Sequence, residues 1–239
     1  MSEKETILGV DVSLKTYDDL TIDLFERMGE GKKSFVVAIN PEKIMKAQED
    51  AALRQLLNEA DFQIPDGIGV ILASRLKGGQ IRSRVTGVDL MMNICQAATQ
   101  QQKCIFLYGA DPGVAVQAKE ELEERLPGIQ IVGTMDGYEK DEAKVLNTIR
   151  TAEPNILFVA MGSPKQEQWI LKHKDTLPAS VYQGVGGSFD VLAGNVRRAP
   201  KLFQKAGMEW FYRLLSQPSR AKRQLALPKF LASVARERS

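Results

Sequence analysis

The chain has 239 residues, of which 44% are hydrophobic and 26% are charged, and its formal net charge is +2. A chain of this size and composition forms a hydrophobic core without disulfide bonds, which excludes the disordered and disulfide-rich classes. No apolar run approaches the ~20 residues that a membrane-spanning helix needs, and the polar residues 1–6 do not resemble a signal peptide. We therefore expect a cytoplasmic protein whose two cysteines, Cys95 and Cys104, are buried thiols.

Short β-branched segments alternate with longer amphipathic segments, which predicts an α/β fold. We expect a Rossmann-like, mainly parallel sheet flanked by helices, because residues 105–108 and 156–160 are continuous apolar runs typical of buried parallel strands. The expected strands are residues 7–12, 34–40, 62–64, 104–108, 129–132, 156–160 and 180–183. The expected helices are residues 17–28, 41–60, 68–76, 88–101, 112–126, 140–152 and 164–173.

Charge is distributed unevenly along the chain. Residues 196–239 contain eleven Lys and Arg against two acids, whereas the preceding 195 residues contain 21 basic and 28 acidic side chains. Apolar residues recur at helical spacing on both sides of Pro218, and Arg213, Arg220 and Arg223 cluster near it. We expect an α/β core over residues 1–195 and a basic amphipathic helical appendage over residues 196–239 that binds an anionic membrane surface.

Three alternatives for this appendage follow from the same pattern. In the first alternative, its helices expose a basic face to solvent and bind nothing. In the second, they pack on the core or on another subunit, so association into a homo-oligomer is left open. A nucleic acid is the third alternative, but the Trp and Leu content of the segment favours a lipid interface, so no nucleic-acid partner is expected.

Two junctions between strands and helices carry polar residues in the first half of the chain. Asn40 and Pro41 suit the N-cap and the first position of a helix. The turn at residues 65–67 presents the Asp66 carboxylate at the end of a strand, where a carboxylate is able to act as a general base. Each motif alone also has an ordinary structural explanation, as the start of a helix or as a turn.

Two later junctions show helix-start signals. After Gly109, Asp111 suits an N-cap that is followed by a proline at the first helical position. Ser163 and Gln166 match a capping box. Lys165 would place a positive charge at an electropositive helix start, which is unfavourable unless an anion binds there.

The glycine-rich residues 184–187 follow an apolar strand and precede Arg197 and Arg198, a combination that favours a diphosphate ligand. The sequence has no D-x-D motif, and His173 is its single histidine, so we expect chemistry without a metal ion or other cofactor. A dinucleotide-dependent oxidoreductase is a further alternative, against which the absence of a G-x-G-x-x-G motif argues.

Taken in order, these segments resemble the WecG/TagA/CpsF glycosyltransferase family over essentially the whole chain. The ordered set is far more specific than any of its motifs. The matching segments are residues 40–42, 65–69, Arg84 with 87–90, 106–110, 137–138, 162–167, 186–190, 198–200 and 209–214. One departure is Ala38, because many members have a threonine two residues before the asparagine that is Asn40 here. Any hydroxyl contact from that position to the substrate is missing or replaced in this chain.

The resemblance implies an inverting, metal-independent transfer of N-acetylmannosamine from a UDP-sugar to undecaprenyl-diphosphate-linked N-acetylglucosamine, a step of wall teichoic acid synthesis. It implies an enzyme that is peripheral on the inner face of the cell membrane, with Asp66 as the catalytic base. Another UDP-hexose or an N-acetylmannosaminuronic acid donor, for capsule, exopolysaccharide or common-antigen synthesis, stays open. The expected substrate-binding residues are Asn40, Arg84, Gly109, Gly162, Lys165, Gln166, Glu167, Gly186, Gly187, Asp190 and Arg198, to which the appendage adds Arg213, Arg220 and Arg223.

Overall fold

The computed structural model describes residues 3–196, 199–200, 203 and 226–237. They fall into two compact units. The first unit comprises residues 1–16, 38–86 and 198–239, and the second unit comprises residues 17–37 and 87–197. Each unit is described by itself.

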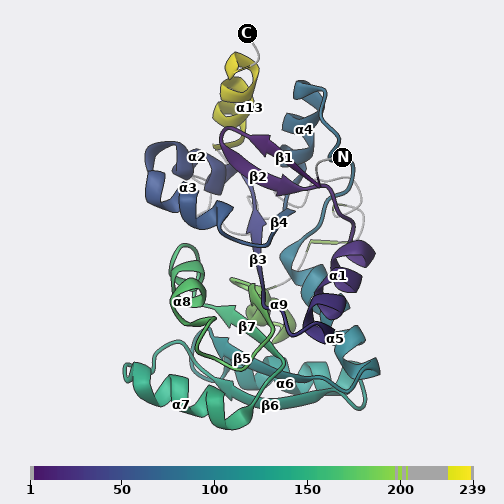
Figure 1. The fold of residues 1–239 in the computed structure, drawn as a ribbon, viewed down its shortest axis with the longest axis vertical. Helices are drawn as coiled ribbons and strands as arrows, with labels where there is room; N and C mark the ends of the chain where they lie inside the picture. The colour runs from purple at the N-terminus through teal and green to yellow at the C-terminus, as the bar shows by residue number, and fades with distance from the viewer. Residues whose placement is uncertain (1–2, 197–198, 201–202, 204–225, 238–239) are drawn as a thin grey trace. The chain divides into compact units, whose positions relative to one another are not determined.

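Six strands pair into one sheet in the order β4-β3-β8-β7-β5-β6, and Figure 1 labels five of them. The pairs β3–β8, β8–β7, β7–β5 and β5–β6 are all parallel, which confirms the α/β, Rossmann-like prediction. Its strands are β3 (Ser34–Ile39), β4 (Phe62–Pro65), β5 (Cys104–Gly109), β6 (Gln130–Met135), β7 (Ile156–Ala160) and β8 (Val181–Gly184). Strands β5 and β7 are apolar and buried almost throughout, as expected for strands covered on both faces.

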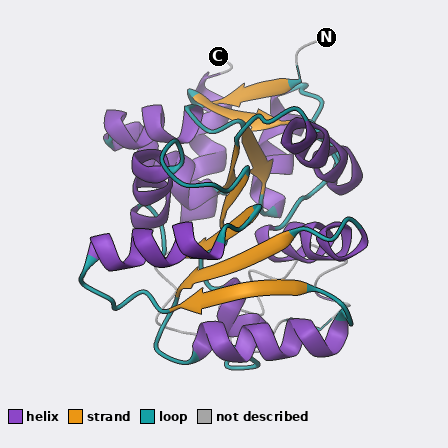
Figure 2. Cartoon of the chain, turned by 60° about the horizontal axis from the view of Figure 1, so that its bottom comes forward, coloured by secondary structure: helices purple, strands orange, loops and turns teal. Residues whose placement is uncertain are grey.

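The helices of the second unit flank its strands; Figure 2 draws helices in purple and strands in orange. They are α1 (Tyr17–Gly29), α5 (Gly87–Gln100), α6 (Val114–Arg125), α7 (Glu142–Ala152), α8 (Lys165–His173) and the short α9 (Ser188–Leu192). Helix α1 packs on α5, α6 packs on β5, β6 and α9, and α8 packs on β7 and β8. The core between these layers includes the fully buried Phe106, Phe158, Tyr182 and Phe189.

In its described residues, the first unit combines a hairpin and strand β4 with four helices. Strands β1 (Lys4–Ile7) and β2 (Val10–Ser13) pair antiparallel. The helices are α2 (Pro41–Glu49), α3 (Ala51–Asn58), α4 (Ile68–Lys77) and α13 (Ala226–Glu237). Helix α13 packs on α2 and α4, with Phe230 and Val234 fully buried.

Two predictions about these elements were wrong for local reasons. Residues 7–12 were expected to be one strand, but Leu8 and Gly9 have φ angles of 48° and 74° and form a two-residue hairpin turn. The apolar Leu8 hides this turn in the sequence pattern. Residues 41–60 were expected to be one helix, but Asp50 ends α2 and then caps α3, since its side chain accepts a hydrogen bond from the Leu53 amide.

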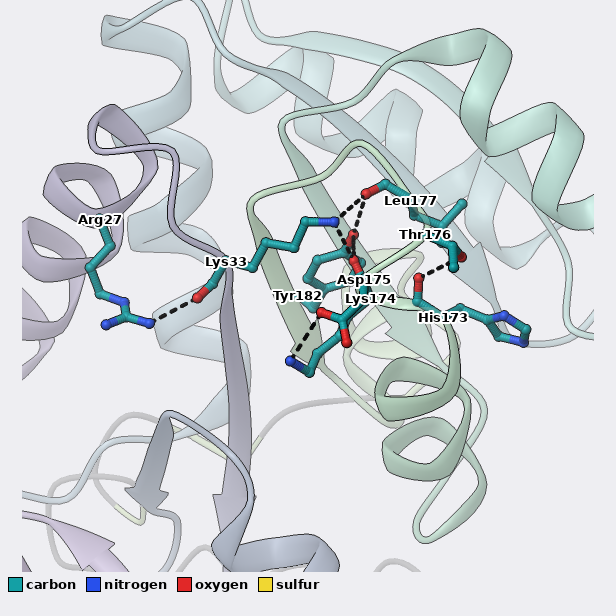
Figure 3. Close-up of polar contacts among 8 residues, drawn as sticks. All are labelled: Arg27, Lys33, His173, Lys174, Asp175, Thr176, Leu177 and Tyr182. Carbon is teal, nitrogen blue, oxygen red and sulfur yellow. Dashed lines mark hydrogen bonds and ion pairs between the residues drawn. The ribbon is translucent and has the colours of Figure 1, made fainter.

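The end of α8 is tied to the start of β3 within the second unit (Figure 3). The Lys33 ammonium donates hydrogen bonds to the carbonyl oxygens of Lys174 and Leu177, at 2.6 and 2.7 Å. The Tyr182 hydroxyl donates to the same two carbonyls, at 3.0 and 3.2 Å. Burial lowers the pKa of Lys33 below its ordinary value. These bonds satisfy carbonyls at the C-terminal end of α8 and thereby fix the helix whose other end faces the candidate site.

Candidate active site

Strands β5 and β7 are neighbours in the sheet, but their onward connections run in opposite directions (Figure 1). β5 continues through α6 to the edge strand β6, whereas β7 continues through α8 to the interior strand β8. Right-handed crossovers in opposite directions place α6 and α8 on opposite faces of the sheet. Such a switch point, at the carboxyl ends of the strands, is where open α/β sheets bind their ligands.

Gly109 allows the loop after β5 to lie against the end of β7. A Cβ at this position, where φ is +114°, would lie 2.4 Å from the Ala160 carbonyl oxygen, so no larger residue fits. The Ala110 amide donates to the same carbonyl at 2.6 Å. The prediction that Asp111 caps the next helix was wrong, because α6 begins at Val114 without a side-chain cap. The Asp111 carboxylate instead accepts a hydrogen bond from the Tyr138 hydroxyl at 2.8 Å.

The loop after β7 leads into α8, which begins at Lys165. Pro164 is its N-cap, and no side chain caps the helix, so the capping box expected from Ser163 is not formed. The Lys165 side chain is exposed at this uncapped helix start. Trp169 holds the helix in place, since its ring centroid lies 4.9 Å from that of Tyr108 on β5 and 4.9 Å from that of His173.

Gln166 is buried and joins the loops that follow β7 and β8. Its Oε1 accepts a hydrogen bond from the Gly186 amide at 3.0 Å, and its Nε2 donates to Glu167 Oε1 at 3.1 Å. A Cβ on Gly184 would lie 2.5 Å from this Nε2, so the glycine makes room for the amide. The structure therefore places Gln166 as the support of the glycine loop.

The loop after β8 contains Gly186, with φ of +52°, and Gly187, which is the N-cap of α9. Asp190 lies in the first turn of α9, and a Cβ on Gly187 would lie 3.8 Å from its Oδ2. Glu167 is fully buried at the start of α8. The second unit thus places eight predicted residues at the carboxyl ends of the adjacent strands β5, β7 and β8 or in the loops and first helical turns that follow them: Gly109, Gly162, Lys165, Gln166, Glu167, Gly186, Gly187 and Asp190.

The first unit gathers Asn40, Asp66 and Arg84. Asn40 caps α2 as predicted, because its Oδ1 accepts from the Lys43 amide at 2.9 Å. The Asp66 amide donates to the carbonyl oxygen of Ile39, the last residue of β3, at 2.8 Å. The Val85 amide, next to Arg84, donates to the Pro65 carbonyl at 3.0 Å. Two backbone hydrogen bonds therefore bring the three predicted residues to the ends of β3 and β4.

Helix α13 supports this region from within the first unit. A Cβ on the buried Gly69 would lie 2.5 Å from Pro41 Cγ and 2.6 Å from Leu227 Cδ1. Gly69 therefore lets the first turns of α2 and α4, which follow Asn40 and Asp66, approach each other and α13.

Some predicted residues lie outside the described part of the chain. They are Arg198, Arg213, Arg220 and Arg223. Sequence reasoning gave no role to Tyr138, which bonds to the loop after β5. The available signals were its place after an expected strand and its presence in the matching segment at residues 137–138. Among the described residues, no three His, Cys, Asp or Glu side chains are grouped to hold a metal ion.

The fold and these strand-end loops, with a carboxylate and several glycines, are typical of α/β enzymes that act on nucleotides. The model of the Glycosyl transferase WecG/TagA/CpsF family matches residues 5–239, and the chain belongs to this family. Two similar relatives are both named N-acetylglucosaminyldiphosphoundecaprenol N-acetyl-beta-D-mannosaminyltransferase. The one from Bacillus spizizenii is 41% identical over 87% of this chain and 80% of its own length. The one from Bacillus subtilis is 39% identical over 84% of this chain and 79% of its own length.

Proposed function

We propose that this protein transfers N-acetylmannosamine from UDP-N-acetylmannosamine to undecaprenyl-diphosphate-linked N-acetylglucosamine, with inversion and without a metal ion. The observation that carries the proposal is the activity for which two relatives at 41% and 39% identity are named, each matched over more than three quarters of its length. The carboxylate and the glycine loops of the two units supply residue types that this reaction needs.

Asp66 is the proposed general base. Its backbone is held between the ends of β3 and β4 by the bond to Ile39, and the turn after it uses Gly67 at a φ of +114°. In the proposed step, an acceptor hydroxyl oxygen forms a bond to the anomeric carbon while the bond from that carbon to the UDP phosphate oxygen breaks. Asp66 takes the hydroxyl proton, and UDP leaves with the electron pair on the opposite face, which inverts the configuration.

The proposed stabilisation of the leaving diphosphate comes from the helix start at Lys165 and the glycine loop at Gly186 and Gly187. An exposed cation at a helix start without a side-chain cap suits an anion. Arg84, in the first unit, is the proposed second cation, and Arg198 and the three arginines of the appendage remain proposed contacts of the acceptor diphosphate.

Membrane association is proposed for the basic residues 196–239. In the part of the chain that the structure describes, no helix is both long and apolar enough to cross a bilayer. The proposal depends on the excess of nine positive charges in this segment, because each Lys or Arg near an anionic leaflet contributes about 1 kcal/mol. Co-sedimentation with anionic vesicles that weakens at high salt supports it, and partitioning equal to that on neutral vesicles contradicts it.

A panel of UDP-sugars tests the donor assignment. The purified full chain is incubated with a lipid-diphosphate N-acetylglucosamine acceptor and UDP-linked N-acetylmannosamine, N-acetylglucosamine, glucose, galactose or N-acetylmannosaminuronic acid. We expect turnover with N-acetylmannosamine at a rate well above all others. Faster turnover of another sugar refutes the donor, and no turnover of any UDP-sugar refutes the proposed function.

Chelation tests the metal independence. Because the sequence has no D-x-D motif, Lys, Arg and helix starts are the proposed source of charge for the leaving group. We expect the initial rate in excess EDTA to match that in untreated buffer. A rate that collapses with EDTA and returns with Mg²⁺ or Mn²⁺ shows that a divalent ion takes part.

A further inference from the structure

Helix α4 exposes two leucines on one face. Among the large hydrophobic side chains that are exposed in the described part of the chain, Leu72 and Leu76 are 36% and 43% exposed, and no other helix or strand carries two such residues. Residues four apart on a helix are neighbours, so the two leucines form one apolar strip. Single exposed hydrophobic residues are ordinary, whereas adjacent ones held in place by the fold are a candidate contact surface.

The fold holds this strip toward solvent. The other side of α4 packs on β1 and α13 (Figure 1), and Val70, Ala73 and Ser74 are buried there. The Ser74 hydroxyl donates to Glu5 Oε2 on β1 at 2.8 Å, and the Gln80 amide donates to the same oxygen at 2.9 Å. Because these bonds fix both the helix and the loop that follows it, α4 cannot turn its leucines inward.

The chain around this strip is basic. Residues 67–88 contain four Lys and Arg and no acid, although acids outnumber bases by 28 to 21 over residues 1–195. Arg75 is exposed on α4 between the two leucines, and Arg82 is exposed in the loop after the helix. The strip therefore lies in a positively charged part of a chain that is acidic up to residue 195.

The acids that contact α4 leave this charge in excess. Glu237 forms an ion pair with Lys77 at 2.8 Å, and Glu5 accepts the two hydrogen bonds described above. Helix α13, which packs on α4, adds the exposed Lys229 and Arg236. Leucines flanked by an excess of Lys and Arg are typical of an interfacial helix, whose apolar face enters an anionic bilayer while its cations meet the headgroups.

Helix α4 also begins directly after the turn that carries Asp66. A helix rises about 1.5 Å per residue, so Leu72 and Leu76 lie about 6 and 12 Å along the axis from Ile68. The proposed acceptor sugar is joined to a membrane lipid by a diphosphate and therefore reacts close to the bilayer surface. A helix that leads from the proposed base to a lipid-binding face suits such an acceptor.

We propose that the exposed face of α4, formed by Leu72, Arg75 and Leu76, enters the surface of an anionic bilayer. This rests on the proposed function, because the lipid-linked acceptor is the reason for a membrane contact. It assigns an apolar contact to the first unit that is separate from the basic residues 196–239, whose proposed attraction to lipid is electrostatic.

Co-sedimentation with phosphatidylglycerol vesicles tests the proposal. The full-length double variant Leu72→Ser, Leu76→Ser is compared with wild type and with Ile22→Ser, a matched control that is 56% exposed on α1 and has no proposed role. At about 1 M salt the Debye length is about 3 Å, so the attraction of the basic residues is screened and an apolar contact remains. There we expect the double variant to bind at least about 10-fold more weakly than wild type, and Ile22→Ser to match wild type.

A probe at residue 76 reports the contact directly. Leu76→Cys and Ile22→Cys are each labelled with an environment-sensitive fluorophore in a Cys104→Ser chain, because Cys95 is fully buried and does not react. We expect vesicles to shift the emission to the blue for the label at residue 76 and to leave it unchanged at residue 22. Equal shifts at both positions, or none at residue 76, refute the proposal.

The outcomes separate this proposal from the proposed function. If the double variant binds like wild type at high salt, or if high salt abolishes wild-type binding, the α4 contact is refuted and the electrostatic role of residues 196–239 stands. If the double substitution changes the sedimentation mass without vesicles, the face is a contact between copies, which also refutes the proposal. Failure of the proposed function appears elsewhere, as no turnover of any UDP-sugar on a soluble acceptor analogue. In that assay we expect the double variant to match wild type.

Discussion

Gly109 shows how a single residue determines the shape of the candidate site. Its backbone has a φ of +114°, and the Ala160 carbonyl stands where a Cβ would be. The sequence marks this glycine as the end of a strand and, through the family resemblance, as a substrate-binding residue, but it does not reveal the close contact with Ala160. A glycine is required here because of β7, which lies next to β5 in the sheet but begins 47 residues after Gly109 in the chain.

We expect Gly109→Ala to lower the free energy of unfolding by about 1–3 kcal/mol or more, because strained backbone and a displaced strand end both add cost. Denaturant unfolding monitored by circular dichroism measures the change. Gly29→Ala is the matched control: no atom lies within 4 Å of its added Cβ, and we expect it to be neutral or stabilising. Equal stability of Gly109→Ala and wild type would contradict the geometry.

At the same scale, Asp66→Asn should fold normally and lose at least about 100-fold in kcat, because an amide accepts no proton from the acceptor hydroxyl. Initial rates of transfer and a thermal melt measure the two properties. Asp175→Asn is the control, since its carboxylate is largely exposed beside Lys174. An Asp66→Asn enzyme that retains activity within a few-fold of wild type removes Asp66 from the role of base.

At the scale of a single element, the packing of helix α13 shows which partner its apolar residues have. The apolar stripe at residues 227, 230, 231 and 234 suggests either a membrane surface or the core as its partner. In the structure Phe230 and Val234 are fully buried against α2 and α4, and Lys77 forms an ion pair with Glu237 at 2.8 Å. This part of the stripe therefore stabilises the first unit.

We expect Phe230→Ala to cost about 3–5 kcal/mol of unfolding free energy, the usual loss for a buried phenylalanine. Lys229→Ala, at an exposed neighbouring position, should change stability by less than about 0.5 kcal/mol. Equilibrium denaturation of both variants checks the difference. A Phe230→Ala protein as stable as the Lys229→Ala protein would mean that α13 does not hold the first unit together.

The elements were predicted from the sequence more fully than the contacts that shape the site. Apolar runs and helix starts marked by proline sufficed for the six strands of the sheet and for the start of α2, as Asn40 and Pro41 show. Local sequence signals gave a wrong prediction where a residue distant in the sequence bonds to the side chain instead. Asp111 was expected to cap a helix, but Tyr138, 27 residues later, takes its carboxylate. The substrate-binding role expected for Gln166 stays a prediction, but the sequence did not reveal that its amide group bonds to Gly186 and Glu167.

At the scale of the whole molecule, the ordered set of short motifs predicted the family, which the match over residues 5–239 confirms. Taken alone, each motif is explained by the start of a helix or by a turn and does not indicate a function. Their order carries information because six of the nine segments lie at the carboxyl ends of the six strands of the sheet, and these ends are where a substrate is bound. The boundary expected at residue 196 and the membrane role of the tail stay predictions.

The stereochemistry of the product tests the central claim most directly. The one-bond carbon–proton coupling at the anomeric carbon, measured by NMR on product made from isotope-labelled UDP-N-acetylmannosamine, distinguishes the two configurations. The account predicts that wild-type enzyme gives a linkage of configuration opposite to that of the donor, and that Asp66→Asn slows its formation at least about 100-fold. A product that retains the configuration of the donor would contradict direct attack by a hydroxyl that Asp66 deprotonates.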